Sequence, residues 1–231
     1  MEKLEVANRQ RRSNIDPYLR KMHLVVTALR EFINTLSSYN DINFLTEFDK
    51  NYLQTIDLQS SYIKGLRQLM IILIRSFNPD FQSLQYLSDL IVCNHMLLLK
   101  LEKCVSQVEY SGPEFNLIEH MKEFTKKDLM RQYGRVLVDY LTNTPLVNDC
   151  VLTMMHHVAG DLESPESLYI PNILQTFSKI WEGGLSICED WVDLIELIIQ
   201  KFIQESQIFI KDRLMNDSLG SVSQISLALS R

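Results

Sequence analysis

Glycine and proline are scarce in this sequence, at seven and six among 231 residues. β-Sandwiches, barrels and nucleotide-binding α/β folds all need many turns, and turns draw heavily on these two residues. Their scarcity therefore argues against those three classes of fold. Apolar residues make up 46% of the chain, which is enough to build a sizeable core.

Cysteine is also rare, and the four cysteines (Cys93, Cys104, Cys150 and Cys188) form no Cys-x-x-Cys pair. Scattered cysteines are typical of a reduced, intracellular protein. The first 20 residues are charged rather than apolar, and the longest apolar stretch is too short to span a bilayer. The sequence thus predicts neither secretion nor contact with a membrane.

Motifs of the common enzyme classes are missing. We find no glycine-rich phosphate loop, no Gly-x-Ser-x-Gly and no His-Glu-x-x-His. The net charge of −6 argues against wrapping of nucleic acid by this chain alone, since binding domains usually show a basic excess. The sequence therefore predicts a non-enzymatic protein with no cofactor, no metal and no small-molecule substrate.

Apolar residues repeat at spacings of three and four, which predicts helices throughout. One helix is expected from an Asp16 cap, with Pro17 in its first turn, to about residue 39. Further helices are expected at 44–53, 66–77, 81–105, 114–126 and 128–141. Another should run from Pro145 to Gly160, which would be left-handed, and the helix at 165–182 should be divided at Pro171. The last helix is expected at 189–210, and its inward-facing residues would be Val192, Ile195, Ile199, Phe202 and Ile203.

Eight or nine helices joined by short breaks, with no alternating strand pattern, predict an all-α fold. The pattern favours an α-solenoid of degenerate armadillo or HEAT-like helical repeats over residues 16–210. Residues 1–15 would be a linker or the end of a preceding helix, and residues 211–231 would be a flexible tail. The whole sequence is expected to be a piece of a longer chain. A compact helical bundle is the alternative. Core positions are expected at Leu69, Leu73, Leu98 and Ile199, and tolerant positions at Glu163 and Ser167.

Two surface patterns are candidate binding sites. Lys127, Arg131 and Arg135 are spaced by four, so they share one helix face that is either simply solvated or contacts DNA or another anionic partner. The second pattern combines acidic residues and tryptophans, and its candidate docking residues for a basic partner helix are Trp181, Trp191, Glu189 and Asp190. Core packing of both tryptophans is the alternative.

The most distinctive run covers residues 148–162, and its notable members are Asn148, Asp149, His156, His157, Gly160 and Asp161. Adjacent histidines on a helix point about 100° apart, so His156 and His157 cannot easily share a metal. A structural role is therefore expected for this run.

With 171–182 and 190–196, this run resembles the Timeless/Timeout family. The resemblance implies a nuclear helical-repeat scaffold without catalytic residues. It also implies a Tipin-like partner, contacts with the replisome and DNA, and a role in stabilising replication forks, in S-phase checkpoint signalling and in DNA repair. A related insect branch serves the circadian clock with Period and cryptochrome, and this role is the alternative.

Overall fold

The structure, a computed structural model, describes residues 2–38, 45–61, 64–105, 116–183 and 189–208. These residues form helices, turns and short connections, with no β-strand among them. The predicted all-α class is therefore confirmed. Within these ranges, no helix is both long enough and apolar enough to cross a membrane. The predicted tail at 211–231 lies outside the described residues.

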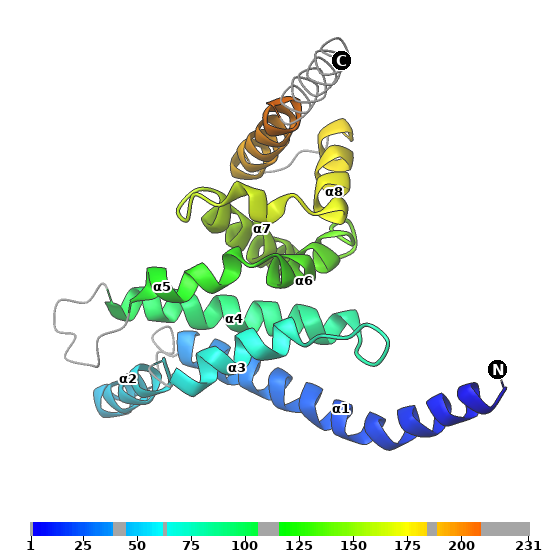
Figure 1. Cartoon of the computed structure of the whole chain (residues 1–231). Coiled ribbons are helices and arrows are strands. Elements are labelled where there is room, and N and C mark those ends of the chain that lie inside the picture. Colours follow the sequence, from blue (N-terminus) through cyan, green and yellow to red (C-terminus); the bar gives the residue numbers. More distant parts are fainter. Residues whose placement is uncertain (1, 39–44, 62–63, 106–115, 184–188, 209–231) are drawn as a thin grey trace, which may run out of the picture.

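The helices stack in successive layers (Figure 1). Helix α1 (Glu2–Ser38) forms the base and packs on α4 (Leu84–Val105). Helices α2 (Glu47–Ser61) and α3 (Lys64–Arg75) also contact α4. The upper layers hold α5 (Leu117–Met121), the 3-10 turn η2 (Lys122–Thr125), α6 (Lys127–Leu137), α7 (Pro145–Ala159), η3 (Pro165–Leu168), α8 (Pro171–Glu182) and a helix at 189–208.

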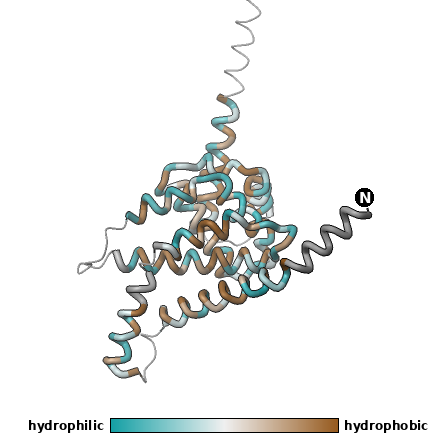
Figure 2. The backbone as a smooth tube through the Cα atoms, turned by 60° about the horizontal axis from the view of Figure 1, so that its bottom comes forward, coloured by the Kyte–Doolittle hydropathy of each residue, from teal (hydrophilic) through white to brown (hydrophobic). Residues whose placement is uncertain are grey.

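Helix α4 lies at the centre of the core. Leu87, Leu90, Ile91 and Leu101 on this helix are fully buried. Figure 2 shows segments of apolar residues concentrated where the helices cross around α4. Leu99 on the same helix, by contrast, is 50% exposed. Helix α4 therefore has one side open to solvent near its C-terminal end.

A buried carboxylate fastens α1 to α4. The Asp89 side chain is 5% exposed and lies 2.9 Å from His23 Nε2 and 2.5 Å from Arg30 Nη1. Gln85 Nε2 donates to the same carboxylate at 3.0 Å. Donors on several sides compensate for the cost of removing this charge from water. They also fix where α1 lies along α4.

The predicted helix start at Asp16 and Pro17 is wrong. Helix α1 begins at Glu2 and contains Pro17, so it crosses the predicted boundary at residue 15. Proline favours the first turn of a helix, but inside a helix it removes only one backbone hydrogen bond and causes a kink. The sequence alone does not separate these two uses of proline.

Several predicted core positions are also wrong. Leu69 is 44% exposed, and Phe202 and Ile203 are 37% and 48% exposed. Leu98 is buried as predicted, while Leu73 and Ile199 are partly buried against the core. Helical spacing finds an apolar stripe, but it does not tell which part of that stripe a neighbouring helix covers.

Candidate partner-binding surfaces

The distinctive run forms α7 and the turn after it. Thr144 caps the helix by accepting a hydrogen bond from the backbone N–H of Val147, and Pro145 is its first residue, as predicted. Asn148 is buried, and its Nδ2 donates to Tyr140 O at 2.7 Å while its Oδ1 accepts from Asn143 Nδ2 at 3.0 Å. Asn148 thus holds the α6–α7 connection in place.

The end of α7 differs from the prediction. Gly160 has φ −92°, so it is not left-handed, and its N–H donates to His156 O at 2.8 Å. A Cβ at Gly160 would lie 3.2 Å from His156 O, so a larger residue would require this carbonyl to shift by a few tenths of an ångström. The left-handed residue of this turn is Glu163, with φ 49°.

The neighbouring histidines have different surroundings. His156 is exposed, whereas Nδ1 of the half-buried His157 pairs with Oδ2 of Asp161. Their rings are perpendicular, with centroids 6.4 Å apart. Asp149, the remaining acidic member of the run, is exposed one turn into α7. No group of three or more His, Cys, Asp or Glu side chains within the described ranges could hold a metal ion.

The predicted basic stripe lies on α6. Lys127 and Arg131 are exposed and Arg135 is half-buried. Nearby cations pair with carboxylates, as when Arg75 contacts Glu123 and Asp128. Across the described part of the chain, no ion pair involves Lys127, Arg131 or Arg135. The stripe therefore keeps its charge available to an anion.

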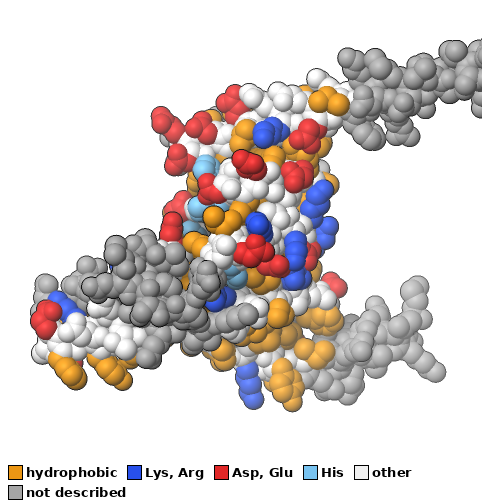
Figure 3. Space-filling model, turned by 60° about the vertical axis from the view of Figure 1, so that its left-hand side comes forward, with side chains coloured by type: hydrophobic (Ala, Val, Ile, Leu, Met, Phe, Trp, Pro, Cys, Tyr) orange, Lys and Arg blue, Asp and Glu red, His pale blue; other side chains and the backbone are white. Residues whose placement is uncertain are grey.

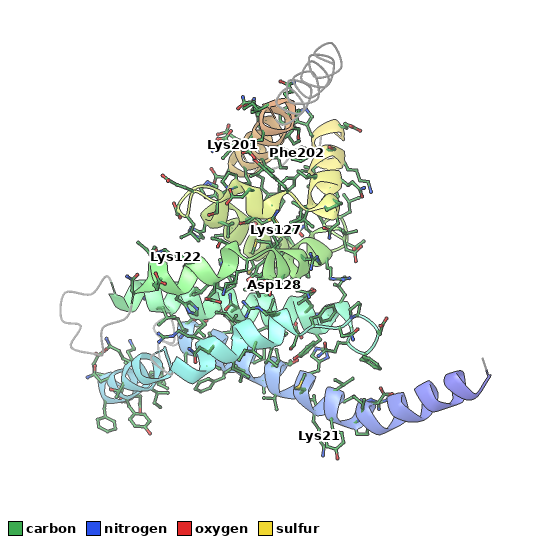
Figure 4. All side chains as sticks on the ribbon, in the orientation of Figure 1. Lys21, Lys122, Lys127, Asp128, Lys201 and Phe202 are labelled. Carbon is green, nitrogen blue, oxygen red and sulfur yellow. The ribbon has the colours of Figure 1, made fainter. Side chains whose placement is uncertain are left out.

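Charge is unevenly distributed over the molecule. Figure 3 shows several Lys and Arg side chains along one edge of the helical body, with Asp and Glu side chains among them, and Asp, Glu and His side chains along the opposite edge. Figure 4 places Lys122, Lys127 and Asp128 over α5, η2 and the start of α6.

The two tryptophans lie in different environments. Trp181 near the end of α8 is 52% exposed, whereas Trp191 is partly buried against the core. Glu189 and Asp190 begin the helix at 189–208, and both are exposed. The structure thus leaves Trp181 accessible to a partner, while Trp191 serves at least in part as packing.

A pocket that the sequence did not reveal lies between α4, α5 and α7. Its volume is about 170 Å³. Its walls are mainly apolar side chains, namely Leu98, Leu99, Leu117, Ile118, Met121, Met154 and Leu162. Its polar lining residues are His95, Glu102, His157 and Asp161. We call this site the α4–α5–α7 pocket.

Burial affects one of these polar groups. The pKa of His95 lies below its usual range, mainly because the ring is removed from water and secondarily because of the nearby His157, while Asp149 acts in the opposite direction. His95 is therefore neutral at neutral pH, and it adds no positive charge to the pocket.

Comparison with known proteins places this arrangement in a family. The model for the TOF1-like helical domain matches residues 127–211. The chain is 46% identical over 203 residues to Protein timeless of Drosophila melanogaster, which covers 87% of the chain and 14% of that protein. It is 44% identical over 178 residues to Protein timeless of Drosophila hydei, covering 77% and 26% respectively. The human Protein timeless homolog is 28% identical over 96 residues, covering 41% and 8%.

The chain belongs to the Timeless/Timeout family. It spans only about a seventh of the length of the Drosophila melanogaster Timeless protein. The matched helical domain runs from α6 into the helix at 189–208, so it contains the basic stripe, the distinctive run and both tryptophans. The residues that carried the resemblance therefore lie mostly in the part of this Timeless segment that the family model matches.

No pattern in the sequence indicated the α4–α5–α7 pocket. Its lining residues come from 95–102, 117–121 and 154–162, which only the packed fold brings together. Leu99 and Ile118 fit the apolar pattern of their helices, and nothing in that pattern tells that they face solvent. Contacts between helices distant in sequence are what the helical period cannot supply.

Proposed function

We propose that this Timeless segment is a non-enzymatic helical platform of a circadian clock regulator that binds Period and cryptochrome in the nucleus. The supporting observation is the difference in identity between relatives. The two Drosophila proteins named Protein timeless are 46% and 44% identical to the chain, against 28%, 27% and 29% for the Timeless homologs of human, mouse and nematode. This difference favours the insect branch that the resemblance linked to the clock.

The layered packing supports a platform built from repeats. Each layer contacts mainly its neighbours, with α1 on α4, α4 on α7 and α6 on α8. Stacking of this kind is typical of an α-solenoid of degenerate armadillo or HEAT-like repeats, which presents long lateral surfaces to partners. We infer that residues 16–210 are part of such an array in this protein.

The exposed Trp181 and the acidic start of the helix at 189–208 form the surface we assign to a basic partner helix. Aromatic side chains accessible to a partner supply much of the binding energy of protein interfaces. Glu189 and Asp190 are exposed and carry the charge that would attract such a helix. Trp191, packed against the core, would position this surface.

Coexpression tests this proposal. The full chain is coexpressed with Period, with cryptochrome and with a Tipin-like protein, and each complex is measured by affinity capture. We expect Period or cryptochrome to be retained selectively, and Trp181→Ala to weaken retention by about tenfold or more. The matched control is Leu141→Ala, because Leu141 is also exposed, at 71%. Selective retention of the Tipin-like protein would refute the clock role.

The basic stripe supports a second candidate, a scaffold at replication forks that contacts DNA. Besides the unpaired charges of α6, Arg135 Nε is buried and has no acceptor among the described residues. A phosphate group would reach the exposed Lys127 and Arg131 side chains, where charge-assisted hydrogen bonds can form.

Charge reversal of the stripe tests the fork candidate. Changing Lys127, Arg131 and Arg135 to Glu should weaken binding of a DNA duplex and lower its dependence on salt. The control changes the exposed Arg20, Lys21 and Lys201 to Glu, which alters the net charge equally. Equal binding by both variants and the unmodified chain would exclude a DNA contact at this stripe.

A further inference from the structure

The α4–α5–α7 pocket is too small for a typical metabolite. Small-molecule sites usually occupy roughly 300–1,000 Å³, whereas this pocket holds about 170 Å³. A space of this size accommodates one or two side chains. Three helices form its walls, so its shape is set by the packed fold.

The mouth of the pocket leaves large apolar side chains in water. Leu99 on α4 is 50% exposed, and Ile118 on α5 is 64% exposed. The inner wall includes Met154 of α7, which is 1% exposed. Covering Leu99 and Ile118 with another apolar side chain would remove this surface from water, which is favourable.

The polar lining of the pocket is acidic. Glu102 lies on the α4 wall and Asp161 follows α7, and no Lys or Arg is among the lining residues. His157 is paired with Asp161, and the half-buried His95 is neutral at neutral pH. Figure 3 shows His side chains next to acidic and apolar ones along this edge of the molecule. A cation close to the apolar mouth would therefore be attracted.

We propose that the α4–α5–α7 pocket docks an amphipathic helical segment of a partner protein that inserts a Leu, Ile or Met side chain and places a Lys or Arg beside Glu102 and Asp161. The inference rests on the proposed role as a partner-binding platform. It adds a site separate from Trp181 and from the basic stripe, and it states the chemistry that this site selects. Helical segments commonly bind in this way, with apolar side chains in a groove and charges at its rim.

Two synthetic peptides serve as probes. Both are helical and carry leucine at the same positions, but the remaining positions are all Lys in one peptide and all Glu in the other. Each carries a fluorophore, and its affinity for the full chain is measured by fluorescence anisotropy at low and high salt. We expect the Lys peptide to bind more tightly than the Glu peptide, with an advantage that shrinks as salt screens the rim.

Variants then locate the binding site. Leu99→Ser combined with Ile118→Ser should weaken binding of the Lys peptide by about tenfold or more. Glu102→Lys should weaken it by roughly threefold to fivefold. All three side chains are exposed, so these changes leave the core intact. Matched controls are Leu141→Ser with Leu146→Ser, which are 71% and 53% exposed, and Glu196→Lys.

Each possible result either supports or overturns the inference about the α4–α5–α7 pocket. Absence of binding by both peptides, equal binding by both, or equal weakening by pocket and control variants would overturn the inference. Period and cryptochrome retention is measured on the same variants. If the chain fails to retain either protein while the pocket still selects the Lys peptide, the clock role fails and the pocket stands. If the chain retains Period or cryptochrome but the pocket does not select the Lys peptide, only the inference about the pocket fails.

Discussion

Single residues in the distinctive run carry the connection between α6 and α7. Asn148 bonds the carbonyl of Tyr140 and the amide of Asn143, while its neighbour Asp149 points to solvent. We expect Asn148→Ala to lower the free energy of unfolding by about 1–3 kcal/mol, because it leaves buried polar groups without partners. Asp149→Ala is the adjacent control and should change it by less than about 0.5 kcal/mol. Urea unfolding followed by circular dichroism measures both, and equal stability of the two variants would contradict the role given to Asn148.

Two cysteines should be chemically inert. Burial raises the pKa of the Cys93 and Cys150 thiols to about 12, so neither forms the reactive thiolate near neutral pH. We expect both to resist a thiol reagent in the folded chain and to react after denaturation. Mass spectrometry of labelled peptides assigns the reaction to each cysteine. Rapid labelling of Cys150 in the native chain would show that α7 opens readily.

Residue roles were predictable where the signal is local. The start of α7 at Pro145 follows from the sequence and is confirmed. Ser167, by contrast, was expected to tolerate change, yet it is 3% exposed and donates to Thr125 O at 2.6 Å. Its acceptor is 42 residues away, so no local pattern reports it. We therefore no longer expect substitution of Ser167 to be silent.

At the scale of the helices, one glycine sets how closely α6 approaches α8. A Cβ on Gly134 would lie 2.6 Å from Ile173 Cγ1, which no ordinary packing allows. Gly134→Ala should therefore cost about 1–3 kcal/mol of stability by forcing the helices apart. Gly65 on α3 has nothing within 4 Å of that position, so Gly65→Ala should be neutral or up to about 1 kcal/mol stabilising. Thermal unfolding compares the two, and a stable Gly134→Ala variant would argue against the close contact.

The Asp89 cluster should decide whether α1 stays on α4. Asp89→Asn removes the charge that Arg30 and His23 face, and we expect a loss of about 1–3 kcal/mol. Amide hydrogen exchange should accelerate in α1 before it does in α7. Glu31→Gln is the control, because the Glu31 side chain is exposed and an ion pair at the surface contributes little. Unchanged exchange in α1 would show that apolar packing alone holds it.

Most helices could be predicted from apolar spacing, but their ends could not. The stretch predicted as a helix at 114–126 contains only α5 and the 3-10 turn η2 within its described part. Helix α6 ends at Leu137 rather than near 141. These ends depend on packing: Phe124 of η2 is fully buried and meets Tyr133 edge-on at 6.2 Å. Such a contact overrides the local preference of the chain.

For the whole molecule, acid should lower stability. The pKa of His95 and that of His120 both lie below their usual range, mainly because burial disfavours the charged ring. The unfolded chain then binds more protons than the folded chain below about pH 6.5. Stability should be fully present above this pH and fall as the pH drops through it. Urea unfolding at a series of pH values measures this fall in the free energy of unfolding. The His95→Gln variant should show a smaller fall. A free energy of unfolding that does not change with pH would contradict the prediction.

The arrangement of the layers was the least predictable level. The all-α class follows from helical spacing and from scarce turn residues, and it is confirmed. The α4–α5–α7 pocket and the separation of charge both depend on which helix lies beside which. Such contacts are set by side-chain fit between distant segments, and a single sequence does not record them.

The uneven charge has a consequence for how a partner arrives. Lys and Arg side chains along one edge and Asp and Glu side chains along the other give the described body an uneven electric field. An approaching charged macromolecule is oriented by that field before any atoms touch, so productive collisions become more frequent. Added electrolyte should therefore slow complex formation far more than it hastens dissociation.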